Sequence, residues 1–328
     1  MAPANIAKAR LDSCEVSFAM ACFNAMPYLD EAIESALAQS GVTLEVLIVD
    51  DGSSDGSDIR AMEWAAYDPR VRFFRTANNG GPGAARNVAL EQMQGEWFAV
   101  LDSDDRILPH RSRVLIDEAE HSGADAIADD LLVFGLDLPP TRFLLHDDER
   151  KPFWMSLENY FADSAVYGGR PNPGFLKPMF RKTKLTRLGL AYNPLLRIAE
   201  DDELMVRVLL GGSRYRIVPA AMYEYRKHSA SISHRLSGEH AQLMVNSEHR
   251  LKSQVIATGH ASPAYWKRWR ALLSAAAFSR SIDYLKSGEL FNALRVLLGR
   301  PRAILLYAMP IKARLRRLRD RIIASGRS

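Results

Sequence analysis

The sequence predicts an α/β protein with a mixed, mostly parallel sheet flanked by helices and followed by a C-terminal helical extension. Apolar segments of strand length alternate with segments of helical periodicity over residues 14–102, and this order is typical of parallel sheets. From about residue 240 onward the pattern is helical. Apolar residues make up 47% of the 328-residue chain, which is enough to bury a substantial core.

The first half of the chain carries the regular alternation. A β-rich stretch at 14–22 precedes a segment, 26–41, that has apolar residues at helical spacing and a glycine at its end. The apolar run from Leu44 enters a turn rich in Asp, Gly and Ser, which predicts a buried strand and its loop. The remaining expected elements are a helix around 59–66, a strand at 71–75, a glycine-rich turn at 78–87 with a helix to Gln94, and a strand at 96–102.

The second half is less regular. Residues 124–134 predict a fifth strand, whereas 135–195 hold many prolines and glycines and predict long ordered loops, with a mobile lid as an open alternative. Residues 198–212 predict a helix that ends at glycine, and 214–233 predict a strand followed by a polar turn.

Composition limits where we expect the protein to work. No apolar run is long enough to span a membrane, and residues 1–10 lack the apolar core of a signal peptide, so neither secretion nor a membrane-spanning segment is expected. Cys14 and Cys22 are too few and too poorly spaced for a disulfide framework or a zinc site, which fits a reducing cytoplasm. We expect both to be small core residues.

Positive charge is concentrated at the C-terminal end. Residues 294–328 contain ten lysines and arginines and one acid, so the rest of the chain is net acidic although the whole chain carries +4. Within 301–328, a helical stripe of apolar residues from Ile311 to Ile322 lies among arginines, which favours attachment to an anionic membrane surface. The acidic body and the single tail aromatic argue against nucleic acid as a partner. Packing of the tail on the acidic body is the open alternative.

Three aspartates, Asp102, Asp104 and Asp105, follow the apolar residues of the strand at 96–102. Carboxylates so close together repel one another unless a partner compensates them. A hard divalent cation, Mg²⁺ or Mn²⁺, suits these oxygen donors and usually completes its coordination with phosphate oxygens of a substrate. The cluster therefore predicts a metal site beside a phosphate-bearing ligand.

A second acidic turn supports a ligand site and weakens the structural alternative. Asp50 and Asp51 also stand at a strand end, and open α/β sheets bind ligands beyond the carboxyl ends of their strands. A carboxylate there can accept a hydrogen bond from a uracil N–H or a ribose hydroxyl. The alternative is a solvated turn in which Asp102 or Ser103 caps a helix that begins near Pro109.

The glycine-rich turn at 78–87 carries one cation, Arg86, in the first turn of the following helix. Exposed N–H groups at a helix N-terminus suit an anion, and arginine suits a phosphate or a neighbouring carboxylate. A tight strand-to-helix turn explains the glycines but not Arg86, because the helix dipole favours an acid there. The segment matches neither a P-loop nor the glycine fingerprint of nicotinamide enzymes, which argues against both classes.

The helix that precedes the final strand begins with four neighbouring acids. Helical geometry places Asp201 on the face of Leu204, so Asp201 points inward, whereas Glu203 and Arg207 are expected to form an exposed ion pair. A partly buried carboxylate at the mouth of a site is what a general base requires. A helix-dipole partner is the alternative for Asp201, and Asp202 is the weaker base candidate.

A basic turn follows the final strand. Arg226, Lys227 and His228 precede serines in residues 225–233. They suit a lid over phosphates, with His228 as a metal or phosphate ligand, and a merely exposed basic turn is the alternative.

Together these stretches resemble the family-2 type of inverting, nucleotide-sugar-dependent glycosyltransferases with the GT-A fold. The matching segments keep the order of that family over roughly residues 14–232, and they are VSFAMACFNAMPYLDEAIESALAQS, EVLIVDDGSSDGS, GPGAARNVAL, GEWFAVLDSDD and EDDELMVRVL. A weaker likeness of GFLKPMFRKTKL to the acceptor-side loop of bacterial exopolysaccharide glycosyltransferases, including the succinoglycan type, favours UDP-glucose as the donor.

The resemblance implies a role for each matching side chain. Asp201 is implied as the general base, Asp51 as the contact to uracil and Asp102 as the contact to the donor ribose. Further donor-side residues implied are Ala21, Phe23, Arg86, Ser103 and Arg226, and the implied acceptor-side residues are Lys177 and Glu200.

The resemblance also implies a metal-dependent reaction. Mn²⁺ or Mg²⁺ would be held by Asp104 and His228, and Asp105 stays open as an alternative to Asp104. A hexose, with glucose favoured, would pass from a UDP-sugar to a saccharide or lipid-linked oligosaccharide acceptor in exopolysaccharide or other surface polysaccharide synthesis. A sugar nucleotidyltransferase and a non-catalytic sugar-nucleotide-binding module are the alternatives.

These expectations divide the chain into three parts. A lead of residues 1–13 would precede a glycosyltransferase domain at 14–235, with a nucleotide half at about 14–105 and an acceptor half at about 106–235. Residues 236–328 would form a helical region ending in the basic tail, which would hold a cytoplasmic enzyme peripherally at the inner face of the membrane.

Overall fold

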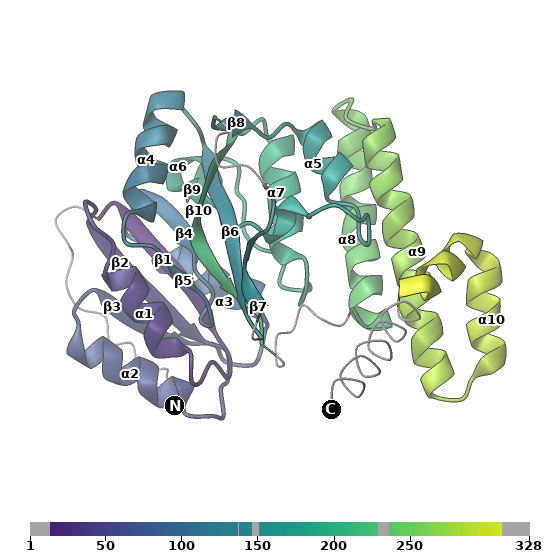
Figure 1. The fold of residues 1–328 in the computed structure, drawn as a ribbon, viewed down its shortest axis with the longest axis horizontal. Helices are drawn as coiled ribbons and strands as arrows, with labels where there is room; N and C mark the ends of the chain where they lie inside the picture. Colours follow the sequence, from purple (N-terminus) through teal and green to yellow (C-terminus); the bar gives the residue numbers. More distant parts are fainter. Residues whose placement is uncertain (1–13, 137, 146–150, 229–235, 310–328) are drawn as a thin grey trace, which may run out of the picture. The chain divides into compact units, whose positions relative to one another are not determined.

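The computed structural model describes residues 14–136, 138–145, 151–228 and 236–309 (Figure 1). The chain forms two compact units. The first, here called the sheet unit, comprises residues 1–164 and 171–232, and the second, the helical unit, comprises residues 165–170 and 233–328. The basic tail beyond residue 309, the lead at 1–13 and the polar turn from residue 229 to 235 lie outside the described residues.

The described part of the sheet unit is built on one ten-stranded sheet in the order β3-β2-β1-β4-β9-β6-β10-β5, with β7 on β6 and β8 on β10. The longer pairings, β1 with β2 and β6 with β10 among them, are parallel, whereas β9 is antiparallel to both of its neighbours. This mixed sheet confirms the predicted fold class. The strands are β1 (Val16–Cys22), β2 (Leu44–Asp50), β3 (Val71–Arg75), β4 (Trp97–Val100), β5 (Arg106–Ile107), β6 (Ala126–Gly135), β7 (Leu138–Arg142), β8 (Phe153–Trp154), β9 (Met179–Arg181) and β10 (Tyr215–Arg226).

Helices flank the sheet (Figure 1). Among them, α3 packs on β1 and β2, and α4 packs on β6 and β10. β2 is buried at every residue, as expected for a strand covered on both faces. The helical elements of the sheet unit are α1 (Leu29–Leu37), α2 (Ser57–Tyr67), α3 (Pro82–Gln92), α4 (Arg111–Ser122), α5 (Leu157–Asp163), η1 (Pro173–Phe175), α6 (Lys182–Arg187) and α7 (Glu200–Leu210).

The structure differs from expectation mainly in the middle of the chain. Residues 135–195 do not form only loops, because they contain short strands and helices, and β9 is inserted into the sheet between β4 and β6. Three residues are too few to show strand periodicity, and the preceding Pro178 resembles a loop signal in the sequence. β9 is nevertheless what joins the β1 half of the sheet to the β6 half.

Three local expectations are corrected as well. α4 begins at Arg111 and has no side-chain cap, so the interpretation of Asp102 or Ser103 as its cap is wrong. Glu203 does pair with Arg207 at 2.8 Å, but it is buried rather than exposed because α7 is covered on nearly every side. Cys22 is a core residue as expected, whereas Cys14 is only half-buried at the sheet margin.

The helical unit contains α8 (Gly238–Ala257), α9 (Pro263–Lys286), α10 (Leu290–Gly299) and η3 (Pro301–Tyr307). α8 packs along α9, with a buried ion pair of Glu248 and Arg268 at 3.1 Å. α10 and η3 close on α9 around a small core of Ala277, Phe278 and Ala303. Among the described residues, no helix combines the length and the apolar character that crossing a bilayer requires.

Candidate active site

Arg86 is the centre of a buried charge network at the carboxyl ends of the strands. It lies on α3, is 3% exposed, and donates from Nη2 to Asp102 Oδ1 at 2.6 Å. Its Nη1 donates to both Glu200 Oε1, at 2.8 Å, and Asp201 Oδ1, at 3.0 Å. The side chain also stacks over the ring of Tyr192. One guanidinium therefore joins the end of β4 to the first turn of α7.

Lys177 is the second buried cation of the network. Its Nζ lies 2.7 Å from Asp102 Oδ2 and 3.4 Å from Asp201 Oδ2. Asp102 and Asp201 are thus each held between the same two cations. We define the charge network as Arg86, Lys177, Asp102, Glu200 and Asp201.

The network shifts the pKa values of its members in opposite directions. Burial raises the pKa of Asp102, but the charges of Lys177 and Arg86 outweigh burial and hold it well below its usual range. Burial and the charge of Asp201 together raise the pKa of Glu200 to about 7, although Arg86 acts against them. Glu200 and Asp201 share one Nη1 donor, so the guanidinium cannot fully compensate both.

Hydrogen bonds tie α3 to the segment that leads into α7. Asn87 exchanges two hydrogen bonds with the backbone of Tyr192, at 2.9 and 2.7 Å. Ala199, which caps α7, has φ of 65°, a left-handed conformation that is uncommon for a residue with a side chain. Asp202 points elsewhere, because its Oδ1 accepts from the Tyr160 hydroxyl at 3.0 Å. Only Glu200 and Asp201 of the four acids therefore reach the charge network.

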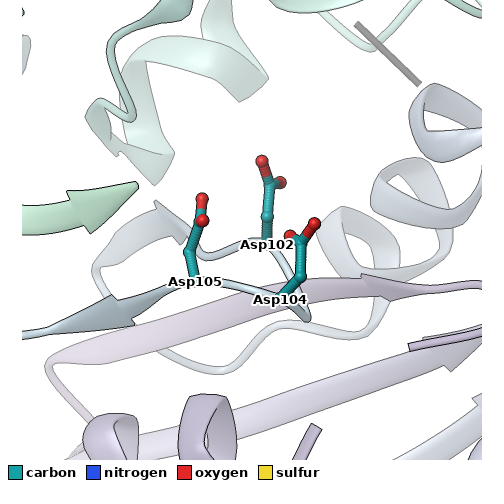
Figure 2. A group of neighbouring side chains, drawn as sticks. All are labelled: Asp102, Asp104 and Asp105. Carbon is teal, nitrogen blue, oxygen red and sulfur yellow. The ribbon is translucent and has the colours of Figure 1, made fainter. Parts of the chain in front are cut away.

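The three aspartates after β4 form a second group of acids (Figure 2). One ligand oxygen from each of Asp102, Asp104 and Asp105 lies within 4.8 Å of the others. Asp104 is the most open of them, and its Oδ2 lies 2.8 Å from His228 Nε2, although 124 residues separate the two in sequence. The structure thus brings together the two residues that the sequence suggested as metal ligands.

Asp105 has a different environment from Asp104. It is 1% exposed, and its oxygens accept from the Tyr223 hydroxyl at 2.9 Å and from the Arg226 backbone N–H at 2.7 Å. Burial and the neighbouring charges of Asp104 and Asp102 raise the pKa of Asp105 well above its usual range. Asp105 therefore faces the protein interior and anchors the turn.

The sequence analysis did not predict two residues that position the site. The Tyr223 hydroxyl also accepts from the Asp102 backbone N–H at 3.0 Å, so it ties both ends of the acidic turn to β10. The fully buried Arg111 pairs with Asp129 at 2.8 Å and donates to the Lys177 backbone oxygen at 2.6 Å. Nothing in the sequence marked these residues, since a core tyrosine and a helix arginine look ordinary.

The donor-side residues of β1 and β2 lie next to one another. The Asp51 N–H donates to the Cys22 carbonyl at 2.8 Å, which places Asp51 beside half-buried Ala21 and exposed Phe23. The Asp51 carboxylate accepts from Thr76 Oγ1, Gly80 N and Gly81 N at 2.8, 2.8 and 2.6 Å. Three of its lone pairs are engaged, so little acceptor capacity remains for a base.

The end of β10 covers the acidic turn from one side. The Arg226 guanidinium donates to the Asp104 backbone oxygen at 2.8 Å and to Glu31 Oε2 at 2.5 Å. It also stacks over Tyr28 and Phe134. Ser103 is buried within the turn. Arg226 is therefore fixed by protein contacts rather than extended into solvent.

Comparisons with known proteins show the family to which this chain belongs. A family model described as "Glycosyl transferase family 2" matches residues 17–185. Succinoglycan biosynthesis protein ExoO of Rhizobium meliloti is 35% identical over 309 residues, which cover 94% of this chain and 88% of ExoO. The chain belongs to glycosyl transferase family 2. The resemblance inferred from the sequence motifs is confirmed, and with it the assignment as a glycosyltransferase.

Further relatives agree with this family-2 assignment. Succinoglycan biosynthesis protein ExoU of Rhizobium meliloti is 33% identical over 226 residues, 67% of this chain and 65% of ExoU. Among solved structures, S. aureus TarS 1-349 in complex with UDP-GlcNAc matches with a TM-score of 0.60 and 17% identity, covering 88% of this chain and 92% of that one. Mannosyltransferase PcManGT of Pyrobaculum calidifontis, in complex with GDP-Man and Mn²⁺, matches with a TM-score of 0.55 and 18% identity, covering 92% and 81%. Both structural likenesses show the fold.

The donor set of this family-2 enzyme fits a hard divalent cation. Carboxylate oxygens and an imidazole are ligands suited to Mn²⁺, and Mg²⁺ prefers the carboxylates alone. Among the described residues, no lysine or arginine side chain pairs with Asp104 or Asp105. Asp104 therefore combines an open carboxylate with a neighbouring imidazole, a donor set that suits a divalent cation.

Proposed function

We propose that the enzyme is an inverting glycosyltransferase that moves a hexose from a UDP-sugar, with UDP-glucose favoured, to a saccharide acceptor in surface polysaccharide synthesis. The observation that carries the proposal is the shared pair of cations. Arg86 and Lys177 hold Asp102, the residue proposed to face the donor ribose, and Asp201, the proposed base, in one network. The kinship to ExoO and ExoU supports an exopolysaccharide pathway, and a lipid-linked acceptor fits that kinship.

We propose that residues at the ends of β1, β2 and β4 bind the donor. Phe23 and Ala21 would border the base, Asp51 would offer its remaining lone pair to uracil, and Asp102 would accept from a ribose hydroxyl. Asp104 and His228 would hold Mn²⁺ or Mg²⁺, which when bound stabilises the negative charge that develops on the leaving diphosphate. Asp105 is proposed to anchor the turn rather than to ligate, because both its oxygens already accept hydrogen bonds.

Asp201 is proposed to take the proton of the acceptor hydroxyl. Its Oδ2 is the less tightly held oxygen, since Lys177 Nζ lies 3.4 Å away, whereas Oδ1 accepts from Arg86 at 3.0 Å. A hydroxyl approaching Oδ2 would be oriented by a carboxylate fixed at two points. As its proton passes to Oδ2, the hydroxyl oxygen would bond to the anomeric carbon on the face opposite the diphosphate. The bond from that carbon to the diphosphate oxygen would break and UDP would leave, which is a single displacement with inversion.

The first test compares Asp201→Asn with Asp202→Asn. The Asp201 variant should lose about 10³-fold or more in transfer rate, because the proton acceptor is gone while the shape is kept. It should still bind UDP within a few-fold. Asp202→Asn, next to it on α7 but bonded to Tyr160, should keep most activity. Equal losses in both variants, or loss of UDP binding together with activity, would remove Asp201 as the base.

The donor is tested by thermal stabilisation with a set of UDP-sugars, each with and without Mn²⁺. A ligand that binds only the folded state raises its stability by mass action. A shift with UDP-glucose that requires metal supports the proposal. A shift that is larger with another nucleotide-sugar, or equal without metal, contradicts the corresponding part of it.

We also propose that the basic tail attaches the enzyme peripherally to the inner face of the membrane. The tail itself lies outside the described residues, and its composition supports the proposal: residues 310–328 carry seven lysines and arginines and one acid. Removing residues 310–328 should lower the membrane-bound fraction of a folded, active enzyme in cell fractionation. An unchanged distribution would count against the tail.

A further inference from the structure

The outer side of α10 and η3 carries exposed apolar side chains although the inner side is already packed. Val296 and Leu297 of α10 lie against the core around Phe278, where the fold needs them. The outward residues have exposed fractions that are unusual for large apolar side chains. They are Leu290 (63%), Phe291 (78%), Leu294 (59%), Leu298 (77%), Ile304 (52%) and Leu305 (74%), and we call them the α10–η3 apolar face.

The four α10 residues of this face are spaced so that their exposure is continuous rather than scattered. Leu290, Leu294 and Leu298 recur every four residues, and Phe291 adjoins them, so on a helix they share one stripe about 100° wide. Single exposed apolar residues are normal, but a stripe of this kind marks an interaction surface. The ten residues of α10 would span only about 15 Å, so the helix suits lying along a surface and not crossing a bilayer.

The charges around this face indicate that its binding partner is anionic. Residues 290–309 contain three arginines, Arg295, Arg300 and Arg302, all exposed, and no acid. The following residues, 310–328, are also strongly basic. Docking of that segment, or of the same face of a second copy, would bring like charges together while burying apolar area. An anionic lipid surface can bury the apolar stripe and also pair its negative charges with the arginines.

We propose that the α10–η3 apolar face inserts into the headgroup and upper acyl region of an anionic membrane, with Arg295, Arg300 and Arg302 at the lipid phosphates. The proposal rests on the peripheral attachment proposed above and deepens it, because it adds a folded, apolar anchor to the basic tail. Two weak membrane signals acting together give stable attachment where one does not. Each basic residue near such a surface contributes about 1 kcal/mol.

The test is flotation of the full chain with phosphatidylcholine vesicles that contain or lack phosphatidylglycerol. The double substitution Leu294→Gln and Leu298→Gln should weaken binding to the anionic vesicles about tenfold or more, since two inserted side chains are replaced by polar ones. The matched control is Ile256→Gln with Leu285→Gln, which changes two exposed apolar residues of α8 and α9 outside the face. The control should float as the parent does.

Deletion of residues 310–328 separates this proposal from that of the tail. If the shortened chain still floats with anionic vesicles and the double substitution then abolishes flotation, the face is an anchor of its own. If the double substitution leaves flotation of the full chain unchanged, the face is overturned, and the tail proposal then stands only if deletion of residues 310–328 itself lowers flotation. Equal thermal unfolding of variant and control excludes misfolding as the cause. A dimer in light scattering that the double substitution dissociates, without vesicle binding, would assign the face to a second copy and overturn the proposal.

Discussion

Two groups of carboxylates meet at the carboxyl ends of the strands, and they are compensated in opposite ways. In the charge network, Asp102, Glu200 and Asp201 are paired with two buried cations. In the acidic turn, Asp104 faces an imidazole and Asp105 faces a hydroxyl and a backbone N–H. Among the described residues, neither Asp104 nor Asp105 has a lysine or arginine side chain as a partner.

The difference indicates that the charge network is organised before a ligand binds, whereas the acidic turn is suited to bind a cation. The charge network holds the proposed base in place before any substrate binds, because fixed charges need not reorganise when the reaction occurs. The acidic turn keeps negative charge that a divalent cation is suited to complete. The following variants test whether the two groups differ in this way, from the largest expected effect to the smallest.

Removing the central cation should disrupt the charge network most severely. Arg86→Leu leaves three carboxylates to one lysine in a buried site, and breaking a buried pair from one side costs about 3–5 kcal/mol. Urea unfolding should show this loss. Arg106→Leu is the control, since Arg106 pairs with Glu224 but its side chain is 41% exposed. A loss below about 1 kcal/mol for Arg86→Leu, within the range of an exposed pair, would contradict the network.

Glu200→Gln should change how stability depends on pH. The pKa of Glu200 rises from 4.5 in the unfolded chain to about 7 in the folded protein, so the folded state binds more protons between these values. The parent therefore loses stability as pH rises through this window, and the variant does not. Above pH 7 the variant should gain roughly 3 kcal/mol relative to the parent, and below pH 4.5 the difference should vanish. The free energy of unfolding of both proteins is measured across this pH range. If it depends on pH in the same way in the parent and in Glu200→Gln, then Arg86 compensates Glu200 fully, and the explanation by a shared guanidinium is wrong.

Asp104→Asn should weaken Mn²⁺ binding, because it removes the most open carboxylate of the turn. We expect the dissociation constant to rise about 100-fold, and titration calorimetry with UDP present measures it. Asp105→Asn is the matched control one residue away, and it should have the smaller effect on affinity because its oxygens face Tyr223 and Arg226. If Asp105→Asn weakens Mn²⁺ binding more than Asp104→Asn does, then Asp105 is the metal ligand and Asp104 is not.

Tyr223→Phe should have the smallest effect. The hydroxyl joins the Asp102 N–H to the Asp105 carboxylate, and its removal should cost about 1–2 kcal/mol of stability together with a few-fold loss in Mn²⁺ affinity. Tyr215→Phe, on the same strand, removes a buried hydroxyl for which the described residues offer no hydrogen-bond partner, and it should be close to neutral. If both variants lose similar stability and Mn²⁺ affinity, the Tyr223 hydroxyl does not position the turn, and Tyr223 acts only through packing.

Local patterns made part of this site predictable. Asp51, Asp102, Asp104 and Asp105 follow apolar runs that are buried strands, and parallel strands present their carboxyl ends at one edge. Helical spacing predicted that Asp201 points inward, and Asp201 does reach Arg86 and Lys177, although it is half-buried whereas Glu200, Asp202 and Glu203 are buried. Glu203, by contrast, was misjudged as exposed because spacing gives the relative direction of side chains and not how many sides of a helix are covered.

Other features depended on contacts between distant segments. β9 has three residues and no periodicity, yet it joins the two halves of the sheet. Lys177 was suggested only through resemblance, and its placement between Asp102 and Asp201 depends on Arg111, which holds its backbone oxygen. No single-sequence pattern encodes a hydrogen bond across 66 residues.

The sequence by itself determined the α/β order, the acids at the strand ends and the basic C-terminal end, because each of these is a local pattern of side-chain type and spacing. Only the tertiary structure decided that Asp104 and not Asp105 is the open carboxylate, that Arg86 and Lys177 clamp Asp201, and that one side of α10 stays uncovered. The physical reason is that burial and charge compensation depend on which distant segments pack together.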